Sequence, residues 1–255
     1  MLLQSGRVLN IAHGGALDPS RANTLEGICD SIAIGVDAIE IDVQVTRDRE
    51  PVLFHDSTFY VFGRWTRISD LSLCELAAVN DSGQSPRIPL LKDVLDILRN
   101  TKILVLLDIK SRGIIDDVMR VIHASNVEDK SWIASFDYSP LIRVKEINPK
   151  IPTILTVGFS RVMANPLGSL WTLFALLFPI FAATRIRANA IFCPAYRVTR
   201  RLVRRAHRQK IAVFVWQLKD HTQASYLPDY NVDGLAIDWQ ATRSRKAEIV
   251  LGPAR

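Results

Sequence analysis

The sequence predicts an α/β protein, a single (β/α)8 barrel over residues 1–255 with a short hairpin after the second strand and an apolar insertion after the fifth. Aliphatic and β-branched runs alternate with amphipathic helical segments along the whole chain. The runs are almost entirely apolar, which is typical of parallel strands covered on both faces. Eight such units in 255 residues fit one barrel, and no linker or repeat divides the chain.

The elements follow in order from these runs. The expected barrel strands are residues 8–12, 38–45, 103–109, 131–136, 152–157, 188–192, 211–216 and 234–238. The expected helices are residues 23–34, 90–98, 114–124, 140–146 and 198–209. One more strand, residues 51–55, follows the turn at 47–50 too closely for a helical crossover. It should therefore pair antiparallel with residues 38–45 as a hairpin.

The barrel prediction implies where the functional groups lie, because barrel active sites form at the carboxyl ends of the strands. Polar and aromatic side chains stand at several of these ends. They are His13 after the first strand, Glu40 and Asp42 in the second, His55 after the hairpin strand, Asp108 and Lys110 at the third and Trp216 at the seventh. We therefore expect one site built from these residues.

The carboxylates indicate a cation site. Glu40 and Asp42 lie two positions apart in a strand and so share a face, and Asp108 adds a third carboxylate from a neighbouring apolar strand. Such a pair is often an ordinary salt-bridge partner. Here the carboxylates interrupt buried strands, where burial without a partner is costly. The pattern favours one divalent cation, Mg²⁺ or Ca²⁺.

Two histidines are candidates for acid–base chemistry. His13 and His55 both close strands next to the carboxylates, and a histidine titrates near neutral pH. His123, His207 and His221 have no comparable setting, so we expect structural roles for them.

The chain resembles the glycerophosphodiester phosphodiesterases over nearly its whole length. The resemblance rests on IAHGGA, ANTLEG and GVDAIEIDVQVTRDREPVLFHDSTF, followed by LLDIK, VFVWQLKD and VDGLAIDW. It implies a barrel that uses a divalent cation to hydrolyse a phosphodiester. By position, it further implies His13 and His55 as the catalytic pair, Glu40, Asp42 and Asp108 as metal ligands, and Gly14, Lys110 and Trp216 as substrate-binding positions.

Three residues depart from the family pattern. Gly14 replaces a phosphate-binding arginine, Ala22 replaces a metal-binding glutamate, and Asp108 stands where many members have glutamate. The remaining ligand set is similar to that of sphingomyelinase D-type phospholipases. Two functions stay open: a phosphodiesterase of glycerophosphodiesters or lysophospholipids, and an impaired barrel that binds phospholipid without turnover.

Charge and hydropathy predict contact with an anionic membrane surface through residues 165–210. No acidic residue occurs between 147 and 219, where twelve are basic, although the net charge is only +6. The apolar run at 170–183 is interrupted by Pro179 and is too short to span a bilayer. An apolar wedge beside a basic helix is typical of peripheral binding. A lid helix or a subunit interface are the alternatives.

Nucleic-acid binding is not expected, because no aromatic platform or known motif accompanies the charge. Three widely spaced cysteines exclude a disulfide scaffold, and residues 1–10 lack the pattern of a secretory leader. We therefore expect a cytoplasmic enzyme that associates peripherally with the membrane.

Overall fold

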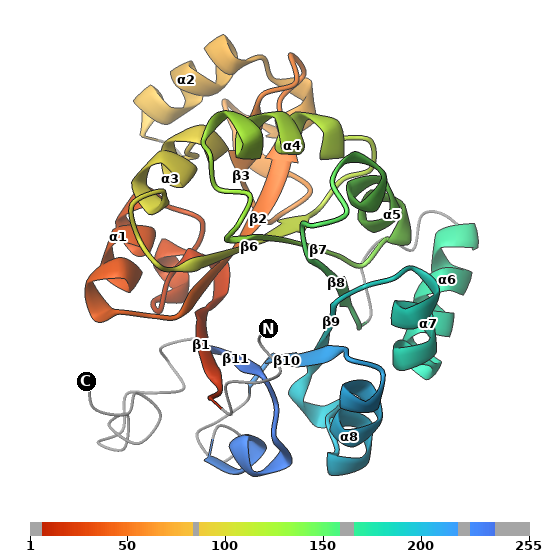
Figure 1. Cartoon of the computed structure of the whole chain (residues 1–255). Coiled ribbons are helices and arrows are strands. Elements are labelled where there is room, and N and C mark those ends of the chain that lie inside the picture. The colour runs from red at the N-terminus through yellow and green to blue at the C-terminus, as the bar shows by residue number, and fades with distance from the viewer. Residues whose placement is uncertain (1–6, 84–86, 159–165, 219–224, 238–255) are drawn as a thin grey trace.

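Eight parallel strands close into a barrel with helices around it in the computed structural model, which describes residues 7–83, 87–158, 166–218 and 225–237 (Figure 1). The strand order around the ring is β1-β2-β6-β7-β8-β9-β10-β11, and β11 pairs again with β1. The predicted (β/α)8 fold is confirmed.

The barrel strands lie within a few residues of the predicted positions. They are β1 (Leu9–Ala12), β2 (Ala38–Val45), β6 (Leu104–Ile109), β7 (Ser131–Ser135), β8 (Thr153–Thr156), β9 (Ala190–Pro194), β10 (Ala212–Trp216) and β11 (Gly234–Ile237). As predicted, β3 (Pro51–Leu53) pairs antiparallel with β2. Residue 238, the predicted end of the last strand, lies outside the described ranges.

Alternation along each strand decides which side chains reach the barrel interior. On β2, Ile39, Ile41 and Val43 are fully buried in the layer between barrel and helices. Glu40 and Asp42 therefore face inward, because successive strand residues point to opposite faces. The middle of the interior is filled by apolar side chains such as Leu106 and Phe214.

Eight α-helices occur in the described ranges, and local capping sets several of their ends. They are α1 (Leu25–Ile34), α2 (Leu73–Ser82), α3 (Leu91–Leu98), α4 (Ile115–Ala124), α5 (Tyr138–Ile147), α6 (Pro166–Leu177), α7 (Pro179–Arg185) and α8 (Arg200–Arg208). Thr24 caps α1 by accepting a hydrogen bond from the Gly27 amide, and Thr199 caps α8 in the same way. The predicted first helix therefore begins at Leu25 rather than residue 23.

The structure adds two details to the connections between the barrel strands that the sequence analysis did not predict. Between β3 and α3 the chain forms a second hairpin, β4 (Phe59–Val61) with β5 (Arg64–Thr66), and then helix α2. These elements enclose a small core of their own around Val61, Ile68 and Leu76. The predicted apolar insertion after the fifth barrel strand forms two helices, α6 and α7, because Pro179 lacks the amide that would continue α6.

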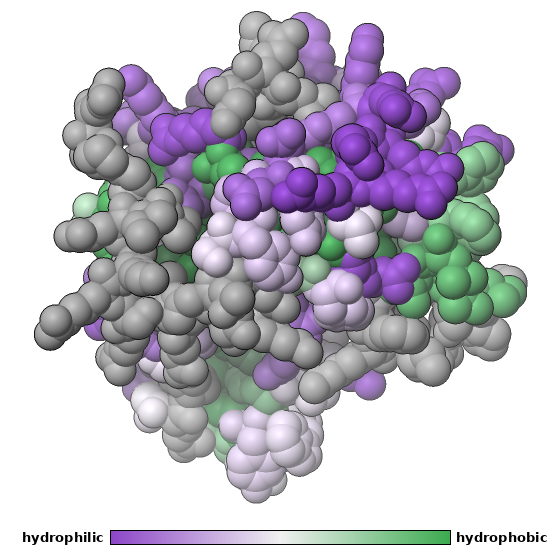
Figure 2. Space-filling model, turned by 90° about the horizontal axis from the view of Figure 1, so that it is seen from below, coloured by the Kyte–Doolittle hydropathy of each residue, from purple (hydrophilic) through white to green (hydrophobic). Residues whose placement is uncertain are grey.

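One face of the molecule combines a hydrophilic and an apolar surface. The buried side of α8 is formed by Val203 and Ala206, and its arginines are exposed. Figure 2 shows a strongly hydrophilic band next to a hydrophobic patch on the face where α8 and the α6–α7 pair lie. None of the helices in the described ranges has the length and hydropathy needed to cross a bilayer.

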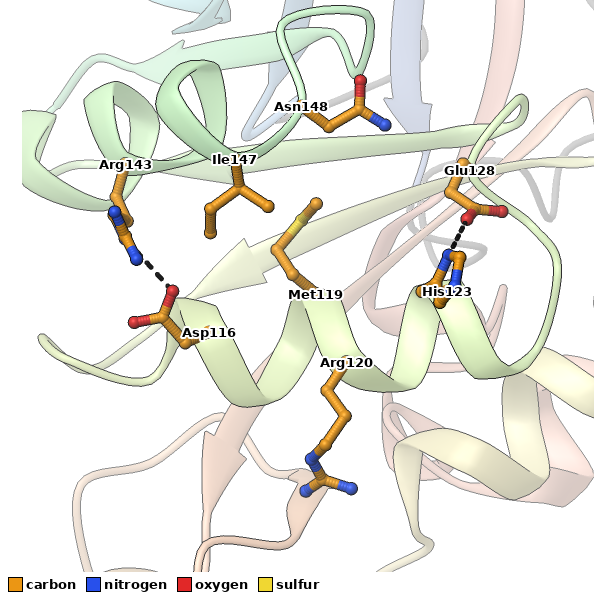
Figure 3. Close-up of a pocket in the computed structure, with 8 residues that line it drawn as sticks. All are labelled: Asp116, Met119, Arg120, His123, Glu128, Arg143, Ile147 and Asn148. Atoms are coloured by element: carbon orange, nitrogen blue, oxygen red, sulfur yellow. Dashed lines mark hydrogen bonds and ion pairs between the residues drawn. The ribbon is translucent and has the colours of Figure 1, made fainter.

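A cavity of about 460 Å³ opens on the outside of the barrel between α4 and α5 (Figure 3). Met119 and Ile147 form its apolar part, and Arg143 pairs with Asp116 at 3.1 Å. His123 pairs with Glu128 at 2.7 Å, so charges around the cavity compensate one another. No predicted site residue lines it.

Candidate active site

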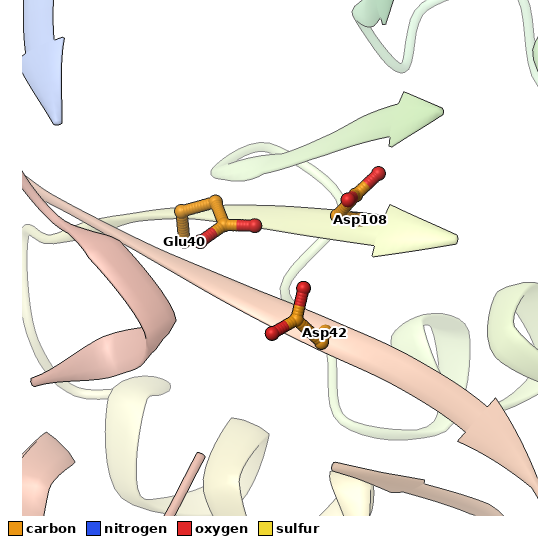
Figure 4. Close-up of side chains that lie close together, drawn as sticks. All are labelled: Glu40, Asp42 and Asp108. Atoms are coloured by element: carbon orange, nitrogen blue, oxygen red, sulfur yellow. The ribbon is translucent and has the colours of Figure 1, made fainter. Parts of the chain in front are cut away.

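Three carboxylates converge inside the barrel on β2 and β6. The parallel register places Asp42 opposite Asp108, and Glu40 lies two residues earlier on the same face of β2. One oxygen from each group lies within 4.8 Å of the others, and all three residues are buried. Figure 4 shows the three carboxyl groups on the same side of the two strands. The sequence prediction that these residues share one face agrees with this geometry.

Lys110 partly neutralises the cluster. Its ammonium Nζ lies 2.7 Å from Asp42 Oδ1 and 2.6 Å from Asp108 Oδ2. Burial lowers the pKa of Lys110, but the charges of Asp108, Asp42 and Glu40 outweigh burial and raise it overall, so the lysine is charged. One positive charge among three acidic groups leaves an excess of negative charge.

The three carboxyl groups differ in pKa because their surroundings differ. Burial and the charge of Asp42 raise the pKa of Glu40 to about 7. Burial also raises the pKa of Asp108, against the opposing charge of Lys110. Burial alone would also raise the pKa of Asp42. The charges of Lys110 and His55 and the hydrogen bonds from Lys110 and Asn23 outweigh burial, so the pKa of Asp42 is lowered. Asp42 is therefore the carboxyl group of the cluster whose surroundings favour the charged form.

Asn23 holds Asp42 in place by two hydrogen bonds. Its amide Nδ2 donates to Asp42 Oδ2 at 2.7 Å, and its Oδ1 accepts from the Asp42 backbone amide at 2.9 Å. Asn23 has a φ of +58°, a conformation that asparagine tolerates better than most residues. The sequence prediction missed this role, although an asparagine next to the position of a lost ligand was a usable signal.

His13 reaches the cluster from the end of β1. Its ring Nε2 lies 3.9 Å from Glu40 Oε2, and the following amide of Gly14 donates to the same oxygen at 2.9 Å. Gly14 and Gly15 both have positive φ, +61° and +72°, so the chain turns sharply directly after the histidine. The turn therefore directs both the His13 side chain and the Gly14 backbone N–H toward Glu40.

Gly14 and Ala22, the two small residues at which the resemblance led us to expect charged side chains, lie close together. A Cβ built on Gly14 would lie 2.9 Å from the Cβ of Ala22. The backbone N–H of Asn23 donates a hydrogen bond to the Gly14 carbonyl at 2.6 Å. The glycine and alanine therefore allow the two loops to approach closely. Gly14 brings a backbone amide to the site but no side chain for phosphate.

His55 reaches the site from the end of β3. Its loop is fixed by Gln44, whose Nε2 donates to the carbonyls of Phe54 and Asp56 at 2.9 and 2.7 Å. Its Nδ1 lies 2.9 Å from Asp56 Oδ1, a contact that orients the ring. The charge of His55 is one of the influences that lower the pKa of Asp42.

Trp216 forms part of an aromatic wall at the end of β10. Its indole Nε1 donates to the Phe192 carbonyl at 3.2 Å, and its ring meets Phe136 edge-on at a centroid distance of 6.1 Å. Gly158 gives the indole its space, since a Cβ there would lie 2.8 Å from the Trp216 ring. Phe136 and Gly158 were not predicted, because their role depends on contacts between strands distant in sequence.

The donor set fits a divalent cation. Asp108 Oδ1 is buried and has no hydrogen-bond partner among the described residues, which is costly for a carboxylate oxygen unless a ligand binds it. Carboxylate oxygens in a partly uncompensated cluster are the ligands that Mg²⁺ and Ca²⁺ prefer. Glu40, Asp42 and Asp108 are thus suited to hold such an ion, as the sequence predicts.

The remaining histidines lie elsewhere. His123 pairs with Glu128 on the outer surface, and His207 pairs with the largely buried Asp233 at 2.8 Å, which joins α8 to the start of β11. His221 lies outside the described residues.

Sequence comparisons place the chain among phosphodiesterases. Residues 13–241 match the model of the Glycerophosphoryl diester phosphodiesterase family. A glycerophosphodiester phosphodiesterase of Caldanaerobacter subterraneus is 26% identical over 91% of this chain and 94% of its own length. A human lysophospholipase D is 27% identical over 58% of this chain and 51% of its own length.

Solved structures share the fold. A phosphodiesterase of Oleispira antarctica, in complex with the product sn-glycerol-3-phosphate, aligns with a TM-score of 0.76 at 18% identity over 98% of this chain and 99% of that chain. A glycerophosphodiester phosphodiesterase of Thermotoga maritima aligns with a TM-score of 0.69 at 20% identity over 92% and 96%.

Proposed function

This chain belongs to the glycerophosphoryl diester phosphodiesterase family and is a phosphoric diester hydrolase, and we propose that its preferred substrates are lysophospholipids at a membrane surface. In this proposal it cleaves the phosphodiester bond on the headgroup side and releases the headgroup, as a lysophospholipase D does. The resemblance to a human lysophospholipase D supports the substrate class.

The observation that carries the proposal is two groups of aromatic contacts, one at the ends of the barrel strands and one on α5 and α6. The first group is Trp216 and Phe136. Tyr138, two residues after Phe136 and at the start of α5, begins the second group: its ring centroid lies 4.8 Å from that of Trp171 of α6, and Trp171 lies 5.8 Å from Phe174. A deacylated headgroup would not use these aromatic surfaces, whereas an acyl chain gains free energy from each apolar contact.

Through Phe174, which contacts Phe178 and Phe181, the second group adjoins an exposed apolar surface on α6 and α7, which we call the α6–α7 patch. Its members are Leu170, Leu173, Leu177, Phe178 and Phe181. Leu170 and Phe181 are 64% and 63% exposed, which is unusual for large apolar side chains grouped together. The Arg197 guanidinium donates to the Leu176 carbonyl and so ties α6 to the loop before α8. Apolar and basic surfaces are therefore continuous, which supports peripheral binding to an anionic cytoplasmic leaflet.

In the proposed reaction, His13 and His55 move the protons. One ring takes the proton from the attacking hydroxyl, of water or of the substrate's own glycerol, as the new P–O bond forms. The other ring gives a proton to the oxygen that leaves as the old P–O bond breaks, and the two roles are exchangeable between the rings. Replacing either histidine by alanine should slow turnover on the order of 10²–10⁴-fold with the fold unchanged. Near-wild-type turnover in both variants would contradict the assignment.

Lys110, together with the cation that the carboxylates would hold, would compensate the negative charge of the phosphate. Glu40, Asp42 and Asp108 would hold the divalent cation, which when bound neutralises phosphate charge and polarises the P–O bonds. Lys110 adds a fixed positive charge beside the same group. Trp216 would pack against the glycerol or the first part of the chain.

A variant of the α6–α7 patch tests the substrate class. Leu173, Leu177 and Phe181 are exposed, so changing all three to serine should leave the fold intact. At about 25 cal/mol per Å² of apolar surface, their loss should weaken vesicle binding at least tenfold. We expect kcat/KM for vesicle-borne lysophospholipid to fall accordingly, and kcat/KM for the deacylated diester to stay unchanged.

The matched control is Ile97→Ser on α3, an exposed apolar residue outside the patch. Equal behaviour of the triple variant and this control on both substrates would overturn the proposal. Vesicle binding without release of headgroup from any phosphodiester, with Mg²⁺ or Ca²⁺ present, would instead favour a phospholipid-binding module.

A further inference from the structure

The β4–β5 hairpin presents aromatic side chains to solvent on one face only. Tyr60 and Trp65 are cross-strand partners, with ring centroids 5.7 Å apart. They are 57% and 71% exposed, and Trp65 is the most exposed of the large apolar side chains in the described ranges. On the opposite face, Phe59 and Val61 are buried in the small core that the hairpin shares with α2. The hairpin is therefore a fixed element with one exposed aromatic face.

The tip of the hairpin adds a third aromatic ring at a position that disfavours it. Phe62 and Gly63 form a two-residue turn with φ of +49° and +77°. Such turns favour asparagine or aspartate before the glycine, and an aromatic residue in the left-handed region is strained. Phe62 is nevertheless exposed, at 56%. Backbone strain of this kind is often associated with functional contacts.

The charges beside these rings indicate the chemistry of that contact. Arg64 and Arg67 are exposed on the hairpin, and no acidic residue occurs between positions 57 and 69. Tryptophan and tyrosine favour the boundary between acyl chains and headgroups, where their rings have apolar and polar neighbours. Arginine complements phosphate. An anionic phospholipid surface supplies both kinds of partner at once.

The hairpin also lies close to the proposed site along the chain. Phe59 follows His55 by four residues, and the Gln44 hydrogen bonds hold the connecting loop. The hairpin leaves the barrel after β2, whereas the α6–α7 patch follows β8, three places further round the ring. Two contacts so far apart on the ring would fix the orientation of the barrel mouth, which a single patch would not.

We propose that the β4–β5 hairpin is a second membrane-contacting element, with Phe62 and Trp65 entering an anionic phospholipid bilayer beside the barrel mouth. The inference rests on the proposed function, because it places the mouth against the surface that holds the acylated substrate. In this arrangement the substrate enters from the bilayer without crossing water.

Fluorescence quenching tests this contact. Vesicles of phosphatidylglycerol and brominated phosphatidylcholine should quench the wild-type protein, and the difference from Trp65→Phe isolates the quenching of Trp65. A Phe62→Ser/Trp65→Ser variant should lose at least tenfold in turnover of vesicle-borne lysophospholipid and retain turnover of a soluble deacylated diester. Ile34→Ser, an exposed apolar residue on α1, is the matched control and should behave as the wild type in both assays.

The outcomes separate this inference from the proposed function. Equal quenching of the wild type and Trp65→Phe would overturn the hairpin contact, even if acylated substrates are preferred. An equal loss of turnover on monomeric lysophospholipid below its micelle concentration would also overturn it, because the hairpin would then bind the substrate's own chain. Quenching of Trp65 without any acyl-chain preference would contradict the proposed substrate class and retain the membrane contact.

Discussion

At the scale of single residues, the site depends on four ionisable side chains that lie buried next to one another. They are Glu40, Asp42, Asp108 and Lys110. Strand alternation predicts that Glu40 and Asp42 share a face, and both do so. The position of Lys110 between Asp42 and Asp108 was not predictable, because it depends on the register between β2 and β6. Sequence patterns report which residues face inward, but not which atoms meet.

The raised pKa of Glu40 predicts how stability depends on pH in the absence of a cation. Burial and Asp42 raise the pKa from 4.5 to about 7 in the folded protein. Between these pH values the folded state keeps a proton that the unfolded state has released, so stability falls as pH rises. The effect is on the order of 3 kcal/mol for this group. The Tm of chelator-treated protein should therefore decrease from pH 5 to pH 8.

Glu40→Gln is the control for this prediction, since the amide imitates the protonated carboxyl at every pH. Its Tm should change less over the same interval, and Mg²⁺ or Ca²⁺ should stabilise the wild type more at pH 8 than at pH 5. Parallel Tm curves for the two proteins would show that Glu40 does not titrate there.

The contact between Gly14 and Ala22 predicts an asymmetric effect of two glycine substitutions. Gly14→Ala and Gly35→Ala both place a Cβ at positive φ, which costs about 1–2 kcal/mol. Only at Gly14 would the Cβ meet another atom, the Ala22 Cβ at 2.9 Å, whereas nothing lies within 4 Å at Gly35. Chemical denaturation should show the larger destabilisation for Gly14→Ala, together with slower turnover. Equal destabilisation of the two variants would contradict the close packing of the two loops.

At the scale of elements, periodicity predicts the barrel strands well and the connections poorly. The apolar run at 38–45 coincides with β2, and the run at 103–109 differs from β6 by one residue at its start, because parallel strands buried on both faces have few polar residues. The β4–β5 hairpin is only three residues long on each strand, and its exposed face is aromatic rather than polar. Alternation over so few residues, with aromatic side chains on both faces, gives no polar–apolar pattern to detect.

The basic helix α8 makes a prediction of its own. Among the described residues, no carboxylate pairs with Arg201, Arg204, Arg205 or Arg208, and all four are exposed. Changing them together to glutamine should therefore leave the Tm nearly unchanged. Each arginine near an anionic leaflet contributes about 1 kcal/mol, so liposome flotation should weaken strongly at low salt and little at high salt. Flotation that matches the wild type at both salt concentrations would exclude α8 from the interface.

At the scale of the whole molecule, barrel topology gathers into one site residues that are widely separated in sequence. His13, Asp42 and Asp108 come from three neighbouring strands of the ring. Their gathering was predictable, since every strand of such a barrel contributes its carboxyl end to one rim. The aromatic contacts between Tyr138 of α5 and Trp171 of α6 were not, because they depend on how an insertion folds back beside the barrel.

An internal competition followed by phosphorus NMR tests the central claim most directly. A lysophospholipid and the deacylated glycerophosphodiester with the same headgroup are mixed in equal amounts with the protein and either Mg²⁺ or Ca²⁺. We expect the signal of the acylated diester to disappear first, and an excess of chelator to stop both reactions. Equal or faster loss of the deacylated diester would contradict the proposed substrate class, and undiminished loss of either diester in chelator would contradict the proposed cation site.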